Sequence, residues 1–379
     1  MNGTWAARFD EFHARAVEQR GLSDFGDAAY HEGLRVLLDA LDDHPPRPGG
    51  KTAAAEGLIV SPLVARLHTE AQWKANPGYR RREITAPLVV IGVPRTGTTA
   101  LHNLLSLDPQ FQGIEKWLTG APLVRPPREE WEAHPQYRSA AQVVEQMFAI
   151  APEVMQAHGV RADEVDECLL PMAQSFCSNW FPSQLDIPVY DRWFLGADER
   201  PSFRRYKDVL RLVGLNDDRR WLLKNPSHVF GVEALLDVFP DACVVQTHRH
   251  PGASLSSLVN LLDNIMRAYT GEGLDRDLRM SREIAFYAEA LRRTMAAQDK
   301  HPDRFVNVLQ RDIRRDPLGV VRSIYDKFGL ELSPEAEAAM TAWANRNSEN
   351  AEGGHAYARL EDDAPALQAF APYIERYGV

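Results

Sequence analysis

The chain has 379 residues, of which 44% are hydrophobic and 25% charged, and its formal net charge is −10. This composition excludes a disordered chain, and the negative charge argues against nucleic-acid binding through bulk charge, so that any bound anion needs a local basic site. The apolar runs are too short to span a bilayer, and the charged N-terminal stretch lacks the apolar core of a signal peptide. The chain has only three cysteines, which fits a reducing compartment. We therefore predict a cytoplasmic globular protein.

The first part of the chain is predicted to be helical. Over residues 5–21 and 27–43 the apolar residues recur at three- and four-residue intervals, which is typical of amphipathic helices, and Gly21 is a suitable stop for the first. Residues 44–51 contain three prolines and two glycines, which cannot continue a helix, so they form a surface connection before a further helical stretch. We interpret residues 1–83 as an N-terminal helical layer packed on the core.

Four short apolar runs have the pattern of strands that are buried in a parallel sheet. They lie at residues 86–93, 221–225, 242–248 and 304–309. A helical segment follows each run, and this repeated strand-loop-helix order is typical of βαβ units. We therefore predict an α/β domain over residues 84–379, with a P-loop-like parallel sheet flanked by helices. A later helix is expected to begin at Pro334, with Ser333 as its N-cap.

Residues 110–214, between the first and second predicted strands, are mainly helical and rich in aromatic residues. We interpret this stretch as a large insertion in the α/β frame that forms a cap over the substrate. Four aromatic side chains in it either line the acceptor pocket or belong to the core: Trp180, Phe181, Trp193 and Phe194. The acidic run over residues 162–170 is expected to form a solvated helix face.

The segment "VIGVPRTGTT" (residues 90–99) reads as a strand end, a glycine-containing turn and the start of a helix. Backbone N–H groups and the positive end of a helix dipole meet there, which makes an anion-binding site. Arg95 adds a fixed charge, and three hydroxyls add donors: Thr96, Thr98 and Thr99. A nucleoside-triphosphate loop has lysine after its second glycine, whereas Thr98 follows Gly97 here, which opposes ATP or GTP hydrolysis.

The string Pro-Arg-Thr-Gly-Thr-Thr resembles the 5′-phosphosulfate loop of the sulfotransferases that use 3′-phosphoadenosine 5′-phosphosulfate (PAPS). Arg95 is similar to the arginine of the tyrosylprotein branch and of many bacterial members, whereas the cytosolic branch has lysine there. A second family motif, an arginine at a strand end with a serine eight residues later, is matched by Arg249 and Ser257. The resemblance implies that the first loop, Gly97 included, binds the 5′-phosphosulfate, and that Arg249 and Ser257 bind the 3′-phosphate.

The resemblance further implies sulfuryl transfer to a hydroxyl of a small-molecule or lipid-like acceptor, with PAPS as co-substrate and no metal. Arg95 and Lys224, at the end of the second predicted strand, would stabilise negative charge on the leaving oxygen. Two residues are candidates for the general base: His228 resembles the catalytic histidine of the cytosolic branch, and Glu115 the glutamate of the tyrosylprotein branch. His158, together with the acidic run, is a third possibility.

The chain departs from the cytosolic branch at two points: Ala100 replaces the aromatic residue that stacks on adenine, and the C-terminal Arg-Lys-Gly loop is missing. Residues 352–360, with His355 and Tyr357, are interpreted as a substitute cover for the nucleotide. His248 and His250 flank the motif arginine, where a histidine could touch the ligand, but alternating histidines at a strand end are usually accidents of spacing. A nucleoside or small-molecule kinase, which the missing loop lysine opposes, and a non-catalytic nucleotide-binding protein remain the alternative functions.

Overall fold

The structure, a computed structural model, describes residues 4–46, 50–150, 161–270, 272–349 and 365–379. The chain divides into two compact units, which we name the helical unit and the sheet unit. The helical unit comprises Met1–Glu83, Ile114–Asp218 and Leu262–Leu274. The sheet unit comprises Ile84–Gly113, Arg219–Leu261 and Asp275–Val379. The N-terminal helices and the insertion thus share one unit. Two expectations stay predictions: that residues 1–83 pack on the core, and that the insertion forms a cap over the substrate.

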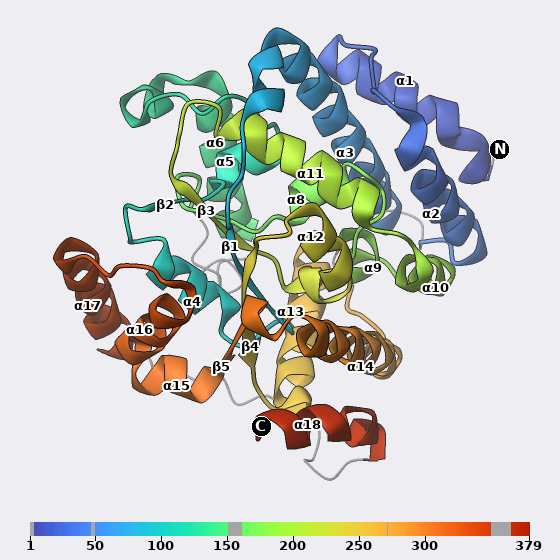
Figure 1. Cartoon of the computed structure of the whole chain (residues 1–379). Coiled ribbons are helices and arrows are strands. Elements are labelled where there is room, and N and C mark those ends of the chain that lie inside the picture. The colour runs from blue at the N-terminus through green and yellow to red at the C-terminus, as the bar shows by residue number, and fades with distance from the viewer. Residues whose placement is uncertain (1–3, 47–49, 151–160, 271, 350–364) are drawn as a thin grey trace. The chain divides into compact units, whose positions relative to one another are not determined.

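The sheet unit contains a parallel sheet of five strands in the order β2-β3-β1-β4-β5, which can be followed in Figure 1. The strands are β1 (Leu88–Gly92), β2 (Phe111–Gln112), β3 (Arg220–Lys224), β4 (Cys243–His248) and β5 (Phe305–Leu309). The predicted α/β class and all four predicted strands are confirmed. The edge strand β2 was not predicted, because two residues are too few to show a hydrophobic period.

The strand β1 is buried along its whole length, because β3 and β4 pair with it on either side. Apolar side chains from strands and helices form one buried cluster around it, which includes Leu88, Val90, Leu101, Leu104, Leu105, Leu222, Val245, Val321, Ile324 and Met340. Each such side chain contributes about 1.5–3 kcal/mol when it is fully buried. The cluster therefore holds the end of β1, and the loop that follows it, in one place.

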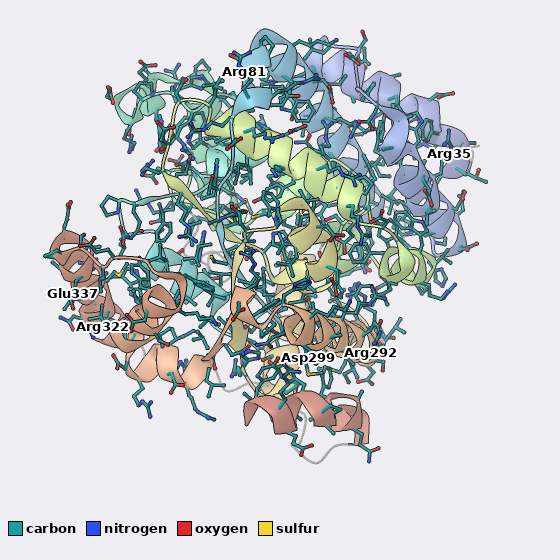
Figure 2. The ribbon with its side chains drawn as sticks, viewed as in Figure 1. Arg35, Arg81, Arg292, Asp299, Arg322 and Glu337 are labelled. Carbon is teal, nitrogen blue, oxygen red and sulfur yellow. The ribbon has the colours of Figure 1, made fainter. Side chains whose placement is uncertain are left out.

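The remaining elements of the sheet unit are helices, with η marking 3₁₀ segments. They are α4 (Thr98–Leu105), η5 (Pro226–Val229), α12 (Val232–Val238), α13 (Pro251–Thr270, whose last residues belong to the helical unit), α14 (Arg276–Lys300), η6 (Pro302–Arg304), α15 (Gln310–Arg315), α16 (Pro317–Phe328), α17 (Pro334–Glu349), η7 (Pro365–Phe370) and α18 (Ala371–Tyr377). The Ser333 hydroxyl accepts from the Ala336 N–H at 3.1 Å, which confirms the predicted N-cap of α17. Arg322 on α16 forms an ion pair with Glu337 on α17 (Figure 2).

The helical unit consists of helices joined by short connections. They are η1 (Ala6–Arg8), α1 (Phe9–Arg20), η2 (Ala28–Tyr30), α2 (His31–Asp43), α3 (Gly50–Ala75), η3 (Pro77–Arg81), α5 (Lys116–Thr119), η4 (Arg128–Ala133), α6 (Pro135–Ile150), α8 (Leu169–Ala173), α9 (Trp180–Gln184), α10 (Pro188–Gly196) and α11 (Arg200–Val213). The predicted stop of the first helix is confirmed, since Gly21 has a φ of +68° and its N–H donates to the Val17 carbonyl at 2.7 Å. In the described ranges, no helix combines the length and the apolar character that crossing a membrane requires.

Buried arginines connect the N-terminal helices to the insertion within the helical unit. Arg66 of α3 donates to the carbonyl oxygens of Phe25 and Gln174 at 2.5 and 3.2 Å. Arg205 of α11 forms an ion pair with Glu70 of α3 at 2.7 Å and donates to the Gln174 side chain at 3.0 Å. Because a buried charge that loses its partner costs several kcal/mol, these arginines require both segments to be in place.

Two of the four aromatic residues considered for the acceptor pocket belong to the core of the helical unit. Phe181 and Phe194 are buried, and the ring of Phe181 stacks on that of Phe176 with centroids 5.2 Å apart. Trp180 and Trp193 are partly buried. Phe181 and Phe194 therefore belong to the core and not to the acceptor pocket.

The acidic run after residue 161 does not form the helix face predicted from the sequence. Its backbone pairs with residues 114–117: the Lys116 N–H donates to the Glu164 carbonyl at 2.9 Å, and Glu115 and Val165 form an antiparallel bridge. Pairing with a segment distant in the sequence therefore overrides the local helical pattern, and this prediction was wrong.

The glycine at the end of β1 generates a testable prediction. Gly92 has a φ of +150°, and a Cβ there would lie 2.5 Å from the Thr247 hydroxyl and 2.7 Å from the Thr247 carbonyl oxygen. We expect Gly92→Ala to lower the free energy of unfolding by about 1–3 kcal/mol, because the backbone of β4 cannot give way.

The control is Gly57→Ala in α3, where nothing lies within 4 Å of the new Cβ. This variant should be neutral or stabilising by up to about 1 kcal/mol. Urea unfolding of both variants makes the measurement, and a Gly92→Ala protein as stable as the parent would contradict the close approach.

Candidate functional site

Three basic side chains predicted for the site lie at one edge of the sheet. The strands β3, β1 and β4 are adjacent and parallel, so their carboxyl ends meet at the same edge. Arg95 follows β1, Lys224 is the last residue of β3, and Arg249 comes directly after β4. Open α/β sheets bind ligands at this edge, and three cations beside a helix N-terminus suit an anionic one.

The turn between β1 and α4 has a strained backbone. Arg95 has a φ of +71°, and Gly97, the N-cap of α4, has a φ of +96°. A left-handed conformation in a residue other than glycine costs on the order of 1–3 kcal/mol and persists only where its surroundings enforce it. Turns of this kind present successive backbone N–H groups to an anion.

The strained residue is held by contacts from residues that follow two other strands, β4 and β5. The Arg95 carbonyl oxygen accepts hydrogen bonds from Arg249 Nη1 at 3.1 Å and from Gln310 Nε2 at 3.3 Å. The Arg95 side chain donates from Nε to the Ser257 hydroxyl at 3.2 Å. The two sequence motifs therefore touch each other directly. Since the C=O and N–H of a trans peptide point in opposite directions, the Thr96 N–H points away from Arg249 and Gln310.

Gln310 was not singled out from the sequence. It is the first residue of α15, directly after β5, and α15 lies so close to the loop that a Cβ on Gly97 would be 3.1 Å from Ile313 Cδ1. The only signal in the sequence is a polar residue immediately after the fourth predicted strand. Its role becomes visible only when β5 is placed beside β4.

The hydroxyl of Thr96 is used inside the protein. This side chain is fully buried, donates to the Val93 carbonyl at 2.6 Å, and lies 2.6 Å from the Thr247 hydroxyl. A hydroxyl has one hydrogen to donate, so the Thr96 hydroxyl has none left for a ligand once it has bonded within the protein. The Thr96 side chain therefore ties the loop to β4, and only its backbone N–H is left for an anion.

Lys224 reaches the N-terminus of α4. Its side chain is almost fully buried, and Nζ donates to the Thr99 hydroxyl at 3.4 Å. Thr98, the residue before Thr99 and the first residue of α4, is also buried. Water screens a charge less in a buried site than on the surface, so Lys224 acts strongly on any charge at this helix end.

His228 lies deep in the sheet unit, in the short segment η5. Asn225 shapes the turn, because its side chain accepts from the Ser227 N–H at 3.0 Å and its carbonyl from the His228 N–H at 3.1 Å. Burial disfavours the charged imidazolium and lowers the pKa of His228 to about 3. The ring is therefore neutral at physiological pH and takes up a proton reluctantly, which weakens it as a general base.

Glu115 lies in the helical unit, in a different unit from Lys224 and His228. It precedes α5, and its Oε2 accepts from Arg125 Nε at 3.0 Å, while Arg125 Nη1 contacts Asp217 Oδ2 at 3.0 Å. The sequence did not point to Arg125, which orients the carboxylate. The other residues considered, His158, His355 and Tyr357, lie outside the described residues. Among those that the structure describes, no cluster of three or more histidine, cysteine, aspartate or glutamate side chains could hold a metal ion.

The lowered pKa of His228 predicts how stability changes with pH. An unfolded histidine takes up a proton near pH 6.5 and the folded one near pH 3, so protons favour the unfolded chain between these values. The free energy of unfolding should therefore decrease as the pH falls from about 7 to about 5, and less steeply in His228→Gln. Urea unfolding across this range measures both slopes.

The exposed His44 offers a matched control, since His44→Gln should keep the slope of the parent. Part of the slope should persist in His228→Gln, because burial also lowers the pKa of His68 and of His248 to about 4. An unchanged slope in His228→Gln would contradict the burial of its ring.

A family model described as the sulfotransferase family matches residues 87–334 of the chain. This range covers all five strands of the sheet and both sequence motifs, from Arg95 to Ser257.

Solved structures and a curated protein are also similar to this chain. The crystal structure of sulfotransferase STF1 from Mycobacterium tuberculosis H37Rv is 36% identical, covering 98% of this chain and 100% of that one, with a TM-score of 0.85. Sulfotransferase STF9 from Mycobacterium avium has the same fold, with a TM-score of 0.85, 24% identity, and coverage of 98% of this chain and 97% of that one. The omega-hydroxy-beta-dihydromenaquinone-9 sulfotransferase Stf3 of Mycobacterium bovis is 25% identical over 268 residues, which are 64% of this chain. The match spans 63% of that protein, less than two thirds of its length.

Proposed function

The chain belongs to the sulfotransferase family, and on this basis we propose that it transfers the sulfuryl group of PAPS to a hydroxyl of a small-molecule or lipid-like acceptor. The observation that carries the proposal is the contact between the two motifs. Arg95 meets Arg249 through its carbonyl oxygen and Ser257 through its side chain. A nucleotide with a 5′-phosphosulfate and a 3′-phosphate needs two neighbouring cationic sites, and these residues supply them at one edge of the sheet.

In this proposal the loop after β1 binds the 5′-phosphosulfate. The residues assigned to this group are Arg95, Thr96, Gly97, Thr98 and Thr99. Arg95 contributes its guanidinium and Thr96 its backbone N–H, since the Thr96 hydroxyl is already used. Gly97 adopts the left-handed φ of +96° that the turn needs, and its missing side chain leaves room for Ile313 of α15 beside the loop. Arg249 and Ser257 bind the 3′-phosphate through hydrogen bonds that are strong because both the guanidinium and the phosphate are charged.

The proposed reaction is an in-line displacement at sulfur. The acceptor oxygen forms a bond to sulfur while the bond from sulfur to the bridging oxygen of the 5′-phosphate breaks, which leaves adenosine 3′,5′-bisphosphate and a sulfate ester. Negative charge grows on the bridging oxygen, and cations already aimed at that position stabilise it without having to reorganise. Lys224, buried at the N-terminus of α4, and Arg95 are assigned this role. The proton of the acceptor hydroxyl goes to a general base.

We favour Glu115 over His228 as that base. The ring of His228 is almost fully buried, which gives an acceptor hydroxyl little access to it. Arg125 donates to the Glu115 carboxylate at 3.0 Å and holds it in one orientation, as a positioned base requires. The glutamate also matches the tyrosylprotein branch, as Arg95 does.

The proposed chemical class of the acceptor is inferred from the name of a related sulfotransferase. Stf3 carries omega-hydroxy-beta-dihydromenaquinone-9 in its name, which is a hydroxylated isoprenoid quinone, and this chain matches 63% of that protein. We propose that the acceptor here is likewise a hydroxyl on a small or lipid-like molecule. A mass-spectrometric screen of hydroxylated compounds with PAPS, which reads an added sulfuryl group, identifies it.

The first prediction for this function concerns the nucleotide. Adenosine 3′,5′-bisphosphate should raise the melting temperature by several degrees, because a ligand that binds only the folded state stabilises it. ATP with Mg²⁺ should do little, since the loop lacks the lysine that binds outer phosphates. Arg249→Ala should lose the effect of the bisphosphate, whereas Arg322→Ala, which changes an ion pair between α16 and α17, should keep it. Stronger stabilisation by ATP would favour a kinase instead.

The second prediction separates the two candidate bases. Glu115→Gln should lower kcat by about 10²- to 10⁴-fold, the usual cost of removing a positioned base, without changing the affinity for PAPS. His228→Gln should lower kcat by less than about 10-fold, and so should Glu130→Gln, an exposed glutamate of the same unit as Glu115. Steady-state rates at saturating PAPS and acceptor make the comparison. A large loss in His228→Gln together with a nearly full rate in Glu115→Gln would assign the base to His228.

A further inference from the structure

One donor to the strained loop comes from a residue to which the proposed chemistry assigns no role. Gln310 directly follows β5 and is the first residue of α15. Its Nε2 donates to the Arg95 carbonyl oxygen at 3.3 Å. In the same loop, a Cβ on Gly97 would lie 3.4 Å from Gln310 Cγ and 3.1 Å from Ile313 Cδ1. A hydrogen bond and close packing therefore both join the start of α15 to the loop.

The pairing of β4 with β5 brings Gln310 to this place. His248 and Leu309, the last residues of the two strands, are partners in the register of the sheet. The residues that follow them, Arg249 and Gln310, therefore leave the sheet next to each other. Both reach the same atom, because Arg249 Nη1 also donates to the Arg95 carbonyl oxygen, at 3.1 Å.

The ring of His248 fastens the end of β4 to its neighbours. This side chain is fully buried, and its Nε2 lies 2.9 Å from Asn307 Oδ1 on β5. Its Nδ1 lies 3.0 Å from the Tyr373 hydroxyl on α18. His248 thus has a structural role in the sheet unit, and it helps to keep the residues after β4 and β5 side by side.

The two donors fix the orientation of the peptide bond between Arg95 and Thr96. Half a turn of this peptide would remove both hydrogen bonds and point the Thr96 N–H at the two N–H donors. A buried polar group left without a partner costs about 1–3 kcal/mol. The φ of +71° at Arg95 is itself unfavourable and needs such support. Gln310 therefore helps to keep the Thr96 N–H directed away from the donors.

We propose that Gln310 is a positioning residue for the 5′-phosphosulfate of the nucleotide, because it keeps the Thr96 N–H turned to the side on which the anion binds. This inference rests on the proposed binding of PAPS. An N–H that is already oriented loses less freedom when the anion binds, so the nucleotide binds more tightly. The effect should be confined to ligands with a 5′-phosphate, since the 3′-phosphate is assigned to Arg249 and Ser257.

The test compares two nucleotides that differ only in the 5′-phosphate. Gln310→Met keeps the length of the side chain and removes its donor. In this variant the dissociation constant of adenosine 3′,5′-bisphosphate should rise about 3- to 10-fold, the usual effect of one hydrogen bond. The dissociation constant of adenosine 3′-monophosphate should not change. Calorimetry measures both constants, and the KM for PAPS should rise by a larger factor than kcat falls.

A second variant, Gln310→Glu, separates hydrogen bonding from packing. A carboxylate has nearly the shape of the carboxamide but only accepts hydrogen bonds. Gln310→Glu should therefore weaken binding of the bisphosphate at least as much as Gln310→Met does. If the side chain only packed on the loop, glutamate would replace it with little effect.

The matched control is Gln110→Met, which removes the same kind of hydrogen bond elsewhere in the sheet unit. Gln110 Nε2 donates to the Glu331 carbonyl oxygen at 3.1 Å. The residue precedes the parallel edge strand β2, so it lies at the edge of the sheet opposite to the loop. This variant should bind both nucleotides as the parent does.

Two results would overturn the positioning role. One is that Gln310→Met and Gln310→Glu bind the bisphosphate as tightly as the parent, and the other is an equal weakening of both nucleotides in Gln310→Met. A parent protein that binds the two nucleotides equally would instead contradict the proposed function, and with it the inference. Melting temperatures of all variants are measured first, so that a loss of folding is not read as a loss of binding.

Discussion

The carbonyl oxygen of Arg95 is the point on which the candidate site depends. It accepts from Arg249, which follows β4, and from Gln310, which follows β5, while Arg95 itself follows β1. A left-handed backbone at an arginine persists only when neighbours enforce it, and these two donors do so. The shape of the loop is thus a consequence of the strand order, because β1, β4 and β5 end side by side.

In this arrangement some polar groups of the loop bind other parts of the protein, and others are left to bind a ligand. The Thr96 hydroxyl and Thr247 fasten the loop to β4, and Gly92 lets the two strands come that close. Side chains buried for this purpose have no hydrogen left to donate to a ligand. Backbone N–H groups and the cations of Arg95 and Lys224 are what remains at the helix end, and these groups suit an anionic ligand.

Burial decides what the histidines do. His228 and His248 are both buried and have lowered pKa values, yet one lies in a turn after β3 and the other joins Tyr373 to Asn307. A lone histidine in a sequence says nothing about its solvation, and solvation sets whether it can act as a base. Orientation favours Glu115 as the proposed base over His228, because Arg125, ten positions further along the chain, holds the Glu115 carboxylate.

The sequence by itself determined the α/β class, the four main strands, the N-cap at Ser333 and the two motifs with Arg95 and Arg249, because these depend on local periodicity, capping and spacing. Only the tertiary structure decided the contacts of Gln310, Tyr373 and Arg125, the two-residue strand β2, and the pairing that keeps residues 162–165 out of a helix. The physical reason is the range of the interactions. Each of these contacts joins atoms from segments that are brought together only when the strands and helices pack, and no period or spacing within either segment records its partner.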